Sequence, residues 1–254
     1  MEFTEKALVL RVGRFREADA WVRMLTPTRG VLTAFAFGGM KSRRRFPGCL
    51  DPLNLVLFKF GSDRRSRYLN LDEGTLLHGH PELRRNQRNL GVAVNCLKFV
   101  EAVQIAAEGA GESYTLLLDL LALLEGEVAL PESLPLLFRA RLGFSQGYRP
   151  DFLSCGACGQ VVGDFDNPQF FVEKGQVLCP SCLEGDERGK GPEAGLPMSS
   201  GALRALDWIM THPPGEWPRL TVPPAVRQEF SLAVERFMAY HLGLEWEGGF
   251  FRNV

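Results

Sequence analysis

Four of the six cysteines are grouped in a spacing that is typical of a metal site. Cys155-Gly156-Ala157-Cys158 and Cys179-Pro180-Ser181-Cys182 are two C-x2-C pairs, about 20 residues apart. Two thiolates three positions apart in a tight turn can bind one edge of a tetrahedral ion, and the second pair closes the site. The pattern predicts one structural Zn²⁺ with Cys155, Cys158, Cys179 and Cys182 as its ligands. Because four protein ligands leave no open position, the ion is not expected to be catalytic.

Two other interpretations use the same cysteines, namely a pair of disulfides or a redox C-x-x-C motif. Persistent disulfides are uncommon in the cytoplasm, and a redox motif needs no second copy. The intervening QFFVEKGQVLC predicts two strands around a turn at Lys174-Gly175, which would bring the two cysteine pairs together. Cys49 and Cys96 stand apart in apolar surroundings, and we expect them to be buried free thiols.

Charge is distributed unevenly along the chain. The formal net charge is only -1, yet residues 1–90 carry 17 Lys and Arg against 9 Asp and Glu, and residues 91–254 carry 12 against 21. Such a difference indicates one module that meets a polyanion and another that does not. The competing interpretation is that the basic side chains are scattered over a solvated surface.

The basic residues of the first part gather in three predicted turns. They are Lys41, Arg43, Arg44 and Arg45 within GGMKSRRRFPG, then Arg11, Arg14 and Arg16, then Arg64, Arg65 and Arg67. Arginines in loops suit bidentate phosphate contacts, so these turns predict a groove for a nucleic-acid backbone. The first group is the leading candidate for DNA binding, with Arg11, Arg14, Arg64, Arg65 and Arg67 as secondary contacts. Trp21, Phe35, Phe37 and Phe46 could stack on bases, although the core of the module is the better interpretation of each.

The apolar pattern divides the chain into a β-rich beginning and a helical remainder. Five short apolar runs predict a small closed or partly open barrel, and they cover residues 4–12, 18–26, 29–37, 51–61 and 66–74. After Pro81 a helical period predicts helices over residues 83–108, 112–126, 131–147, 199–212 and 221–243. Pro131 is expected to suit a helix start, and a Ser or Thr is expected to cap each of the last two helices.

Several classes of function lack their sequence signals. No apolar stretch approaches the roughly 20 residues that span a bilayer, and the N-terminus has no signal-peptide pattern, so a cytoplasmic protein is expected. No phosphate-binding loop, nucleophile elbow or dinucleotide fingerprint occurs, which argues against an enzyme. His78-Gly79-His80 could hold a metal, but no carboxylate pattern accompanies it, and a turn that closes the barrel is the better interpretation.

The order of these parts resembles the RecO family of bacterial recombination mediators. The resemblance is carried by TEKALVLRVGRFREADAWVRMLTPTRGVLTAFAFGG with the basic K-S-R run after it, by LDPLNLVLF and GYRPDFLSCGACG, and by FMAYHLGL. It implies a multidomain α+β protein with an N-terminal OB-fold β-barrel, an α-helical domain and an inserted zinc-ribbon-like element. On this chain we expect the DNA-binding OB-fold at 1–82 and the first part of the helical domain at 83–150. The zinc-binding insertion is expected at 151–185, and the linker and closing helices at 186–254.

The resemblance also implies a function. Such a protein is non-catalytic and nucleoid-associated, binds single- and double-stranded DNA and anneals complementary strands. With RecR it helps load recombinase onto strands coated by the single-stranded-DNA-binding protein (SSB), whose C-terminal tail it recognises. Two other classes stay open. One is an interaction adaptor that works through its zinc ribbon and acidic helical domain, and the other is a zinc hydrolase, which would need an open metal position.

Overall fold

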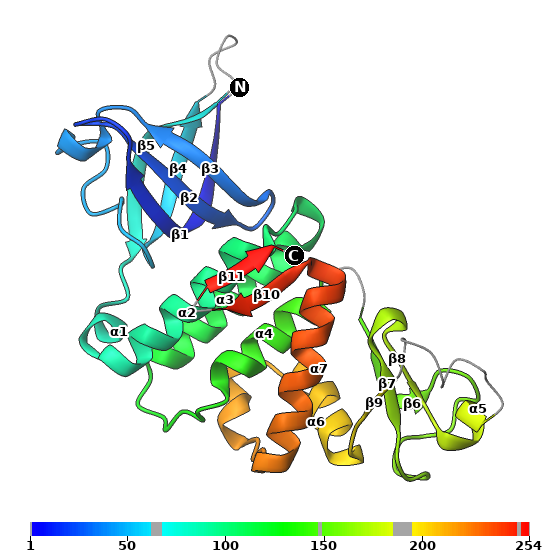
Figure 1. Ribbon diagram of the computed structural model, residues 1–254. Helices are drawn as coiled ribbons and strands as arrows, with labels where there is room; N and C mark the ends of the chain where they lie inside the picture. The colour runs from blue at the N-terminus through cyan, green and yellow to red at the C-terminus, as the bar shows by residue number, and fades with distance from the viewer. Residues whose placement is uncertain (1, 62–67, 147–148, 185–194, 248–249, 254) are drawn as a thin grey trace. The chain divides into compact units, whose positions relative to one another are not determined.

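The computed structural model describes residues 2–61, 68–146, 149–184, 195–247 and 250–253 (Figure 1). The chain divides into two compact units, Met1–Gly126 and Glu127–Val254. The first unit contains a β-barrel with three helices, and the second contains further helices and a cysteine-rich sheet. The finer domain boundaries predicted at residues 82, 150 and 185 stay predictions.

Five strands form the barrel of the first unit. They are β1 (Phe3–Arg14), β2 (Ala20–Thr26), β3 (Gly30–Ala36), β4 (Leu55–Gly61) and β5 (Leu69–His78). Their order around the closed barrel is β1-β2-β3-β5-β4, with β3 and β5 parallel and the other pairs antiparallel. A closed, five-stranded barrel of this kind is OB-like, which confirms the fold predicted for the beginning of the chain.

Alternate side chains of the strands fill the barrel interior. Val22 and Met24 of β2 are fully buried and pack in one cluster with Phe58 and Phe60 of β4. The long loop between β3 and β4 contributes Phe46 to the same cluster, as expected. Cys49 of this loop and Cys96 are buried free thiols, which confirms their prediction. The barrel is therefore stabilised by a continuous apolar core.

Three helices complete the first unit, namely α1 (Pro81–Arg85), α2 (Gln87–Val103) and α3 (Ala110–Glu125). The prediction of one helix over residues 83–108 is wrong in its extent. Asn86 interrupts it, because its side chain accepts a hydrogen bond from the backbone N–H of Asn89 (3.1 Å) and so caps α2. Gln104 adopts a left-handed conformation (φ 53°) and ends α2.

The segment after α2 is joined to the barrel by backbone contacts. The N–H of Val31 in β3 donates to the carbonyl of Ile105 (2.8 Å). Gly30, at φ +71°, approaches so closely that an added Cβ would lie 2.1 Å from the same carbonyl oxygen. Arg23 of β2 also pairs with Glu101 of α2 (3.5 Å). The barrel and the helices are thus packed as one unit.

The helices of the second unit are α4 (Leu134–Phe144), α6 (Ser200–Thr211) and α7 (Pro224–Leu242). Ser199 caps α6 as predicted, since its hydroxyl accepts from the N–H of Ala202 (3.2 Å). Two predicted starts are wrong, because α4 begins three residues after Pro131, and Pro223 rather than Thr221 precedes α7. The hairpin of β10 (Leu244–Glu247) and β11 (Phe250–Asn253) was not predicted. In the described residues no helix is long and apolar enough to cross a membrane.

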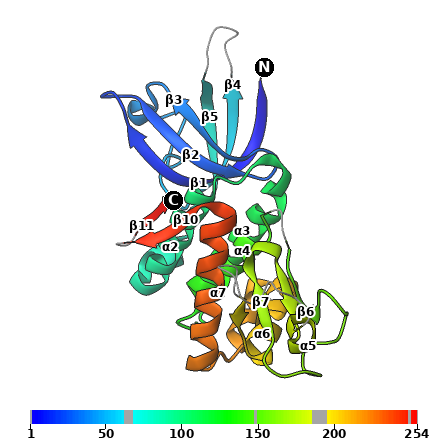
Figure 2. The same ribbon diagram turned by 45° about the vertical axis from the view of Figure 1, so that its right-hand side comes forward.

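The cysteine-rich sheet has the strand order β6-β8-β7-β9. Its strands are β6 (Asp151–Cys155), β7 (Gln169–Phe171), β8 (Gln176–Leu178) and β9 (Leu196–Pro197), and the short helix α5 (Pro180–Glu184) follows β8. The antiparallel pair β7–β8 turns through Gly175 in a left-handed conformation, which confirms the predicted strand pair. The sheet lies beside α6 and α7 (Figure 2), and the Nε2 of His241 in α7 is 2.8 Å from the carbonyl oxygen of Val172.

Candidate functional site

The four cysteines predicted as ligands meet at one edge of this sheet. Cys155 ends β6 and Cys179 follows β8, and the carboxyl ends of these two parallel strands lie together. Cys158 lies in the turn after β6, and Cys182 lies in α5. All four sulfur atoms are within 4.8 Å of one another. The structure therefore confirms that the two pairs come together.

The sulfur positions fit one tetrahedral ion. The Sγ atoms of Cys158 and Cys179 are 3.8 Å apart, and four sulfurs at about 2.3 Å from a common metal would be separated by about 3.8 Å. All six cysteines are free thiols, and a disulfide would need an S–S distance of about 2.05 Å. The cluster can hold a metal ion, and the protein supplies all four ligands.

Tight turns shape each cysteine pair. The N–H of Gly159 (φ +75°) donates to the carbonyl of Cys155 (2.8 Å), and the N–H of Gly156 donates to Val177 in β8 (2.8 Å). In the second pair, the N–H of Cys182 donates to the carbonyl of Cys179 (3.1 Å). The glycines allow the turn of the first pair, and the bond to β8 fixes it against the second pair.

Backbone donors favour a thiolate at Cys155. Burial would raise its pKa, but hydrogen bonds from the backbone of Cys158, Cys179 and Ala157 outweigh burial and lower the pKa to about 6. One of these bonds joins the Cys179 N–H to the Cys155 Sγ (3.4 Å). The neighbouring thiols raise the pKa of Cys182 to about 12. Four sulfurs this close cannot all ionise without a cation between them.

A second group of candidate functional residues lies on the barrel, where the β1–β2 turn meets the loop after β3. Asp19 of the turn accepts a hydrogen bond from the N–H of Gly38 (2.7 Å), and the carbonyl of Ala18 accepts one from Met40 (3.0 Å). Lys41 forms an ion pair with Glu17 (2.5 Å). Two of the predicted basic turns are thus brought together on one surface.

The four leading cations are all exposed, but they differ in their contacts. Arg45 donates to the carbonyl of Phe37 and lies over the ring of Phe46, 5.1 Å from its centroid. Arg43 and Arg44 make no hydrogen bond or ion pair with any residue that the structure describes. These two guanidinium groups are therefore the most available for a phosphate.

The secondary cations are only partly placed. Arg14 is exposed at the end of β1. Arg11 lies over the ring of Trp21, 5.6 Å from its centroid, and 3.9 Å from the carboxylate of Glu101. Arg64, Arg65 and Arg67 lie outside the described residues.

Four aromatic side chains, here called the aromatic patch, adjoin these cations: Phe15, Phe35, Phe37 and Tyr68. Phe35 lies 5.3 Å from Phe15 and 5.1 Å from Tyr68, between ring centroids. Phe15 lies 6.0 Å from Phe37. Phe37 is 46% exposed and Tyr68 is 60% exposed, so part of each ring is accessible from solvent.

The barrel-core interpretation is wrong for three of the four aromatic residues considered from the sequence. Trp21 and Phe35 oppose each other across β2 and β3 on the outer face, because their neighbours Val22 and Ala34 point inward. Phe37 lies just beyond β3 and is exposed. Only Phe46 is in the core.

Sequence reasoning missed two members of the patch and one carboxylate. Phe15 stands between two arginines and Tyr68 follows another, and this arrangement is a signal that could have found them. The interpretation of His78-Gly79-His80 also needs correction. His78 does end β5 and His80 does precede α1, but a carboxylate is close to both rings, namely Glu125 of α3.

The chain that carries this OB-like barrel, helical part and four-cysteine cluster is similar to a class of DNA repair proteins. Residues 1–80 match the family described as Recombination protein O N terminal, and residues 84–247 match Recombination protein O C terminal. The chain is similar to proteins named DNA repair protein RecO from three bacteria. It is 48% identical to that of Oleidesulfovibrio alaskensis, 43% to that of Maridesulfovibrio salexigens and 35% to that of Lawsonia intracellularis. Each comparison covers 100% of both chains. The chain belongs to the RecO family.

Proposed function

We propose that the protein is a non-catalytic DNA-binding protein of recombinational repair. It binds single- and double-stranded DNA and anneals complementary strands, and with RecR it helps load recombinase onto SSB-coated single strands. The observation that carries the proposal is the meeting of exposed arginines and exposed aromatic rings on one barrel surface. Membership of the RecO family supports the same function.

The arginines and the aromatic rings would make different contacts with DNA. Arg43, Arg44 and Arg14 would neutralise phosphates, and each contact releases condensed counterions. Phe37 and Tyr68 would stack on unpaired bases, which is sequence-tolerant because every base has a π-face. Neutralised strands repel each other less, so complementary strands can approach. Base pairing then supplies the driving force, and annealing needs no nucleotide hydrolysis.

We propose that the four-cysteine cluster holds one Zn²⁺. Thiolates select borderline and soft ions, and a closed four-sulfur set is typical of structural zinc. The ion would join the turn after β6 to α5 and so stabilise a segment with a small core. Its chemistry when bound is confined to neutralising the thiolates. The hydrolase alternative gains no support from this cluster, because Cys155, Cys158, Cys179 and Cys182 would fill all four positions of a tetrahedral ion.

A groove in the second unit has apolar, basic and acidic side chains in its lining, the acidic ones being Glu235 and Glu245. It has a volume of about 360 Å³ and lies between α4, α7 and the β10–β11 hairpin. Leu232, Leu244 and Trp246 supply apolar surface, and Arg139 and Arg236 lie at the same groove. An acidic, apolar C-terminal peptide would place its apolar side chains against the apolar surface and its carboxylates near the two arginines. We propose this groove as the docking place of the tail.

The first test is fluorescence anisotropy of a labelled single-stranded oligonucleotide across a salt series. It compares the wild type with the Lys41/Arg43/Arg44/Arg45 quadruple alanine variant. We expect weaker binding and a log–log salt slope that is shallower by about two or more, because each of up to four phosphate contacts contributes about 0.7. A matched control removes four exposed cations on other elements, Arg85, Arg88, Lys98 and Arg219, and should leave the slope unchanged. Equal slopes for the wild type and the loop variant would favour the adaptor alternative.

The aromatic patch has a separate signature. Phe37→Ala and Tyr68→Ala should each weaken single-strand binding by about 1–3 kcal/mol without changing the salt slope, since stacking involves no counterions. Binding to a blunt duplex should change less, because its bases are already stacked. The same anisotropy assay with both oligonucleotides measures this. Equal losses on single strands and duplex would remove base stacking from the proposal.

A further inference from the structure

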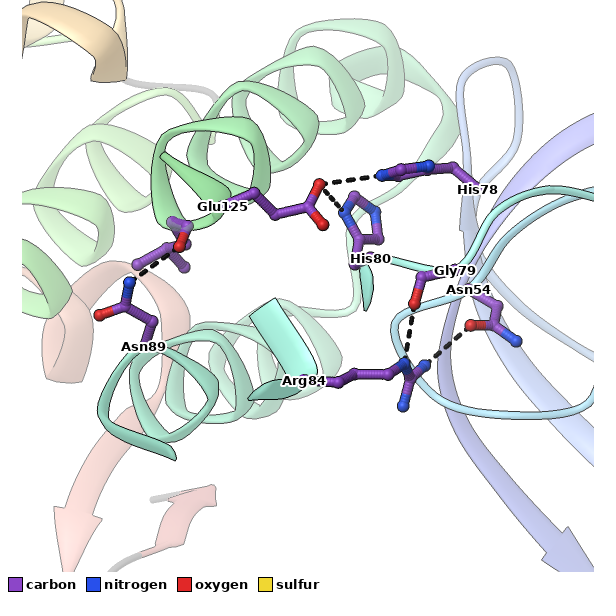
Figure 3. Close-up of polar contacts among 8 residues, drawn as sticks. Asn54, His78, Gly79, His80, Arg84, Asn89 and Glu125 are labelled. Atoms are coloured by element: carbon purple, nitrogen blue, oxygen red, sulfur yellow. Dashed lines mark hydrogen bonds and ion pairs between the residues drawn. The ribbon is translucent and has the colours of Figure 1, made fainter. Parts of the chain in front are cut away.

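His78, His80 and Glu125 form a second cluster of metal-ligating side chains, within the first unit (Figure 3). His78 ends β5, His80 immediately precedes α1, and Glu125 is the last residue of α3. His78 Nε2 and His80 Nδ1 are each 2.9 Å from the same carboxylate oxygen, Oε2 of Glu125. The three possible ligand atoms lie within 4.8 Å of one another.

The ring nitrogens can face the carboxylate in two protonation states. With the protons on His78 Nε2 and His80 Nδ1, both rings donate to Glu125. With the protons on the opposite nitrogens, two imidazole lone pairs and a carboxylate oxygen face one another within 4.8 Å, so an ion among them could accept all three. His78 is half exposed, so its Nδ1–H would then face solvent. Each change of tautomer moves one proton from one ring nitrogen to the other by exchange with solvent, and it leaves the charge of the ring unchanged.

His80 is not fully satisfied by hydrogen bonds. Its side chain is about 6% exposed, and its Nε2 has no hydrogen-bond partner among the described residues. A buried polar nitrogen without a partner is destabilising. A coordinate bond at Nδ1 would leave Nε2 without a partner as before, and it would offset that cost by replacing one hydrogen bond with a stronger interaction.

Neighbouring contacts hold the three side chains in place. Arg84 Nε donates to the carbonyl of Gly79 (2.8 Å), and Arg84 Nη2 donates to Asn54 Oδ1 (2.8 Å), which fixes the peptide between the two histidines (Figure 3). Beside Glu125, Asn89 Nδ2 donates to the carbonyl of Leu124 (2.8 Å) and holds the end of α3. The ligand set is therefore positioned by the fold and not only by its own contacts.

We propose that His78, His80 and Glu125 bind one divalent transition-metal ion, with Zn²⁺ as the preferred occupant. Two imidazoles and one carboxylate suit Zn²⁺, Co²⁺ and Ni²⁺ better than Mg²⁺ or Ca²⁺, which prefer oxygen ligands. The exposed side of His78 leaves room for a solvent ligand. The ion would fasten the last strand of the barrel to the end of α3. The site is separate from the four-cysteine cluster and does not depend on the proposed DNA binding.

The test uses the full chain with its four-cysteine cluster saturated with Zn²⁺ and the excess removed by gel filtration. Titration calorimetry with Ni²⁺ then counts further ions. We expect one more ion per chain in the wild type. Co²⁺ bound in the same way should give visible d–d bands without an added thiolate charge-transfer band, because no sulfur is in this site.

Two variants and a matched control complete the experiment. Glu125→Gln and His78→Asn should each weaken the added binding by at least about tenfold, since loss of even an outer-shell partner costs 10–100-fold. Glu127→Gln removes an exposed carboxylate two residues away and should bind as the wild type does. If Glu125→Gln fails to fold, the test relies on His78→Asn, because the His78 side chain is half exposed and its replacement should be tolerated. No added ion in the wild type, or an added ion bound equally by all variants, would overturn the proposal.

Discussion

The barrel and the cysteine-rich segment 151–184 differ in what holds them together. The barrel encloses a continuous apolar cluster that includes Val22, Met24, Phe58 and Phe60. The cysteine-rich segment also buries apolar side chains, including Phe152 and Phe170, and in addition it brings four sulfur atoms within 4.8 Å of one another. The barrel gains stability from the area it removes from water, and the segment would add to such burial the free energy of binding an ion. Their responses to mutation and to pH should therefore differ.

The largest difference is expected on losing a metal ligand. Structural zinc supplies about 10–16 kcal/mol in zinc-finger peptides at pH 7. Cys158→Ser should therefore abolish tight metal binding and raise hydrogen exchange throughout residues 151–184, with little change in the barrel. Metal content by mass spectrometry and exchange by peptide mapping check this. Cys96→Ala, which removes a buried thiol outside the cluster, should keep the ion. Full protection of the segment without metal would show that its apolar core suffices.

The reverse experiment removes an aromatic ring from the barrel. Phe58 is fully buried, and its ring packs directly against Gly74, where an added Cβ would lie 2.8 Å from it. Because Gly74 has no side chain, it cannot fill the space that the ring would leave. Phe58→Ala should lower the free energy of unfolding of the first unit by about 3–5 kcal/mol. Urea unfolding monitored with a first-unit probe measures the change, and metal content should stay at the wild-type value. Concerted loss of metal and barrel would contradict the distinction drawn between the two regions.

The smallest effect is a pH dependence of opposite sign in the first unit, which contains the barrel, and in the cysteine-rich segment. Burial, and then the charge of Glu5, raises the pKa of Tyr114 in α3 to about 12. The unfolded chain releases the Tyr114 proton near pH 10, whereas the folded chain keeps it until about pH 12. The folded state is therefore fully stable with respect to this group below pH 10, and its free energy of unfolding falls as pH rises toward 12. Metal held by thiolates is instead released in acid, because protons compete for sulfur.

Tyr114→Phe isolates the alkaline part. The hydroxyl is buried without a hydrogen-bond partner among the described residues, so at pH 7 the variant should be within about 1 kcal/mol of the wild type. Thermal unfolding at pH 7, 9 and 11 should show the wild type losing more stability than the variant above pH 10. Identical alkaline profiles would mean that Tyr114 does not titrate with unfolding.

Local sequence patterns predicted those features that depend on neighbours in the chain. The strands of the barrel followed from five short apolar runs, and the cysteine cluster followed from two C-x2-C pairs and the turn at Gly175. The helix boundary at Asn86 was missed because a side-chain cap competes with a helical period that continues past it. The aromatic patch and the carboxylate of Glu125 were missed for another reason. They depend on which strand and helix ends meet, and that is decided by tertiary packing between segments distant in sequence.

The contact between Gly30 and the carbonyl of Ile105 has a consequence for where the chain can be cut. Val31 completes its hydrogen bonding with a residue that lies beyond the first two helices. A fragment that stops after β5 would leave an unpaired strand edge and uncover apolar surface, both of which promote aggregation. A fragment that stops at Gly126 would keep its own covering. The barrel with its three helices, and not the barrel alone, is therefore the fragment that could be transferred intact into another protein.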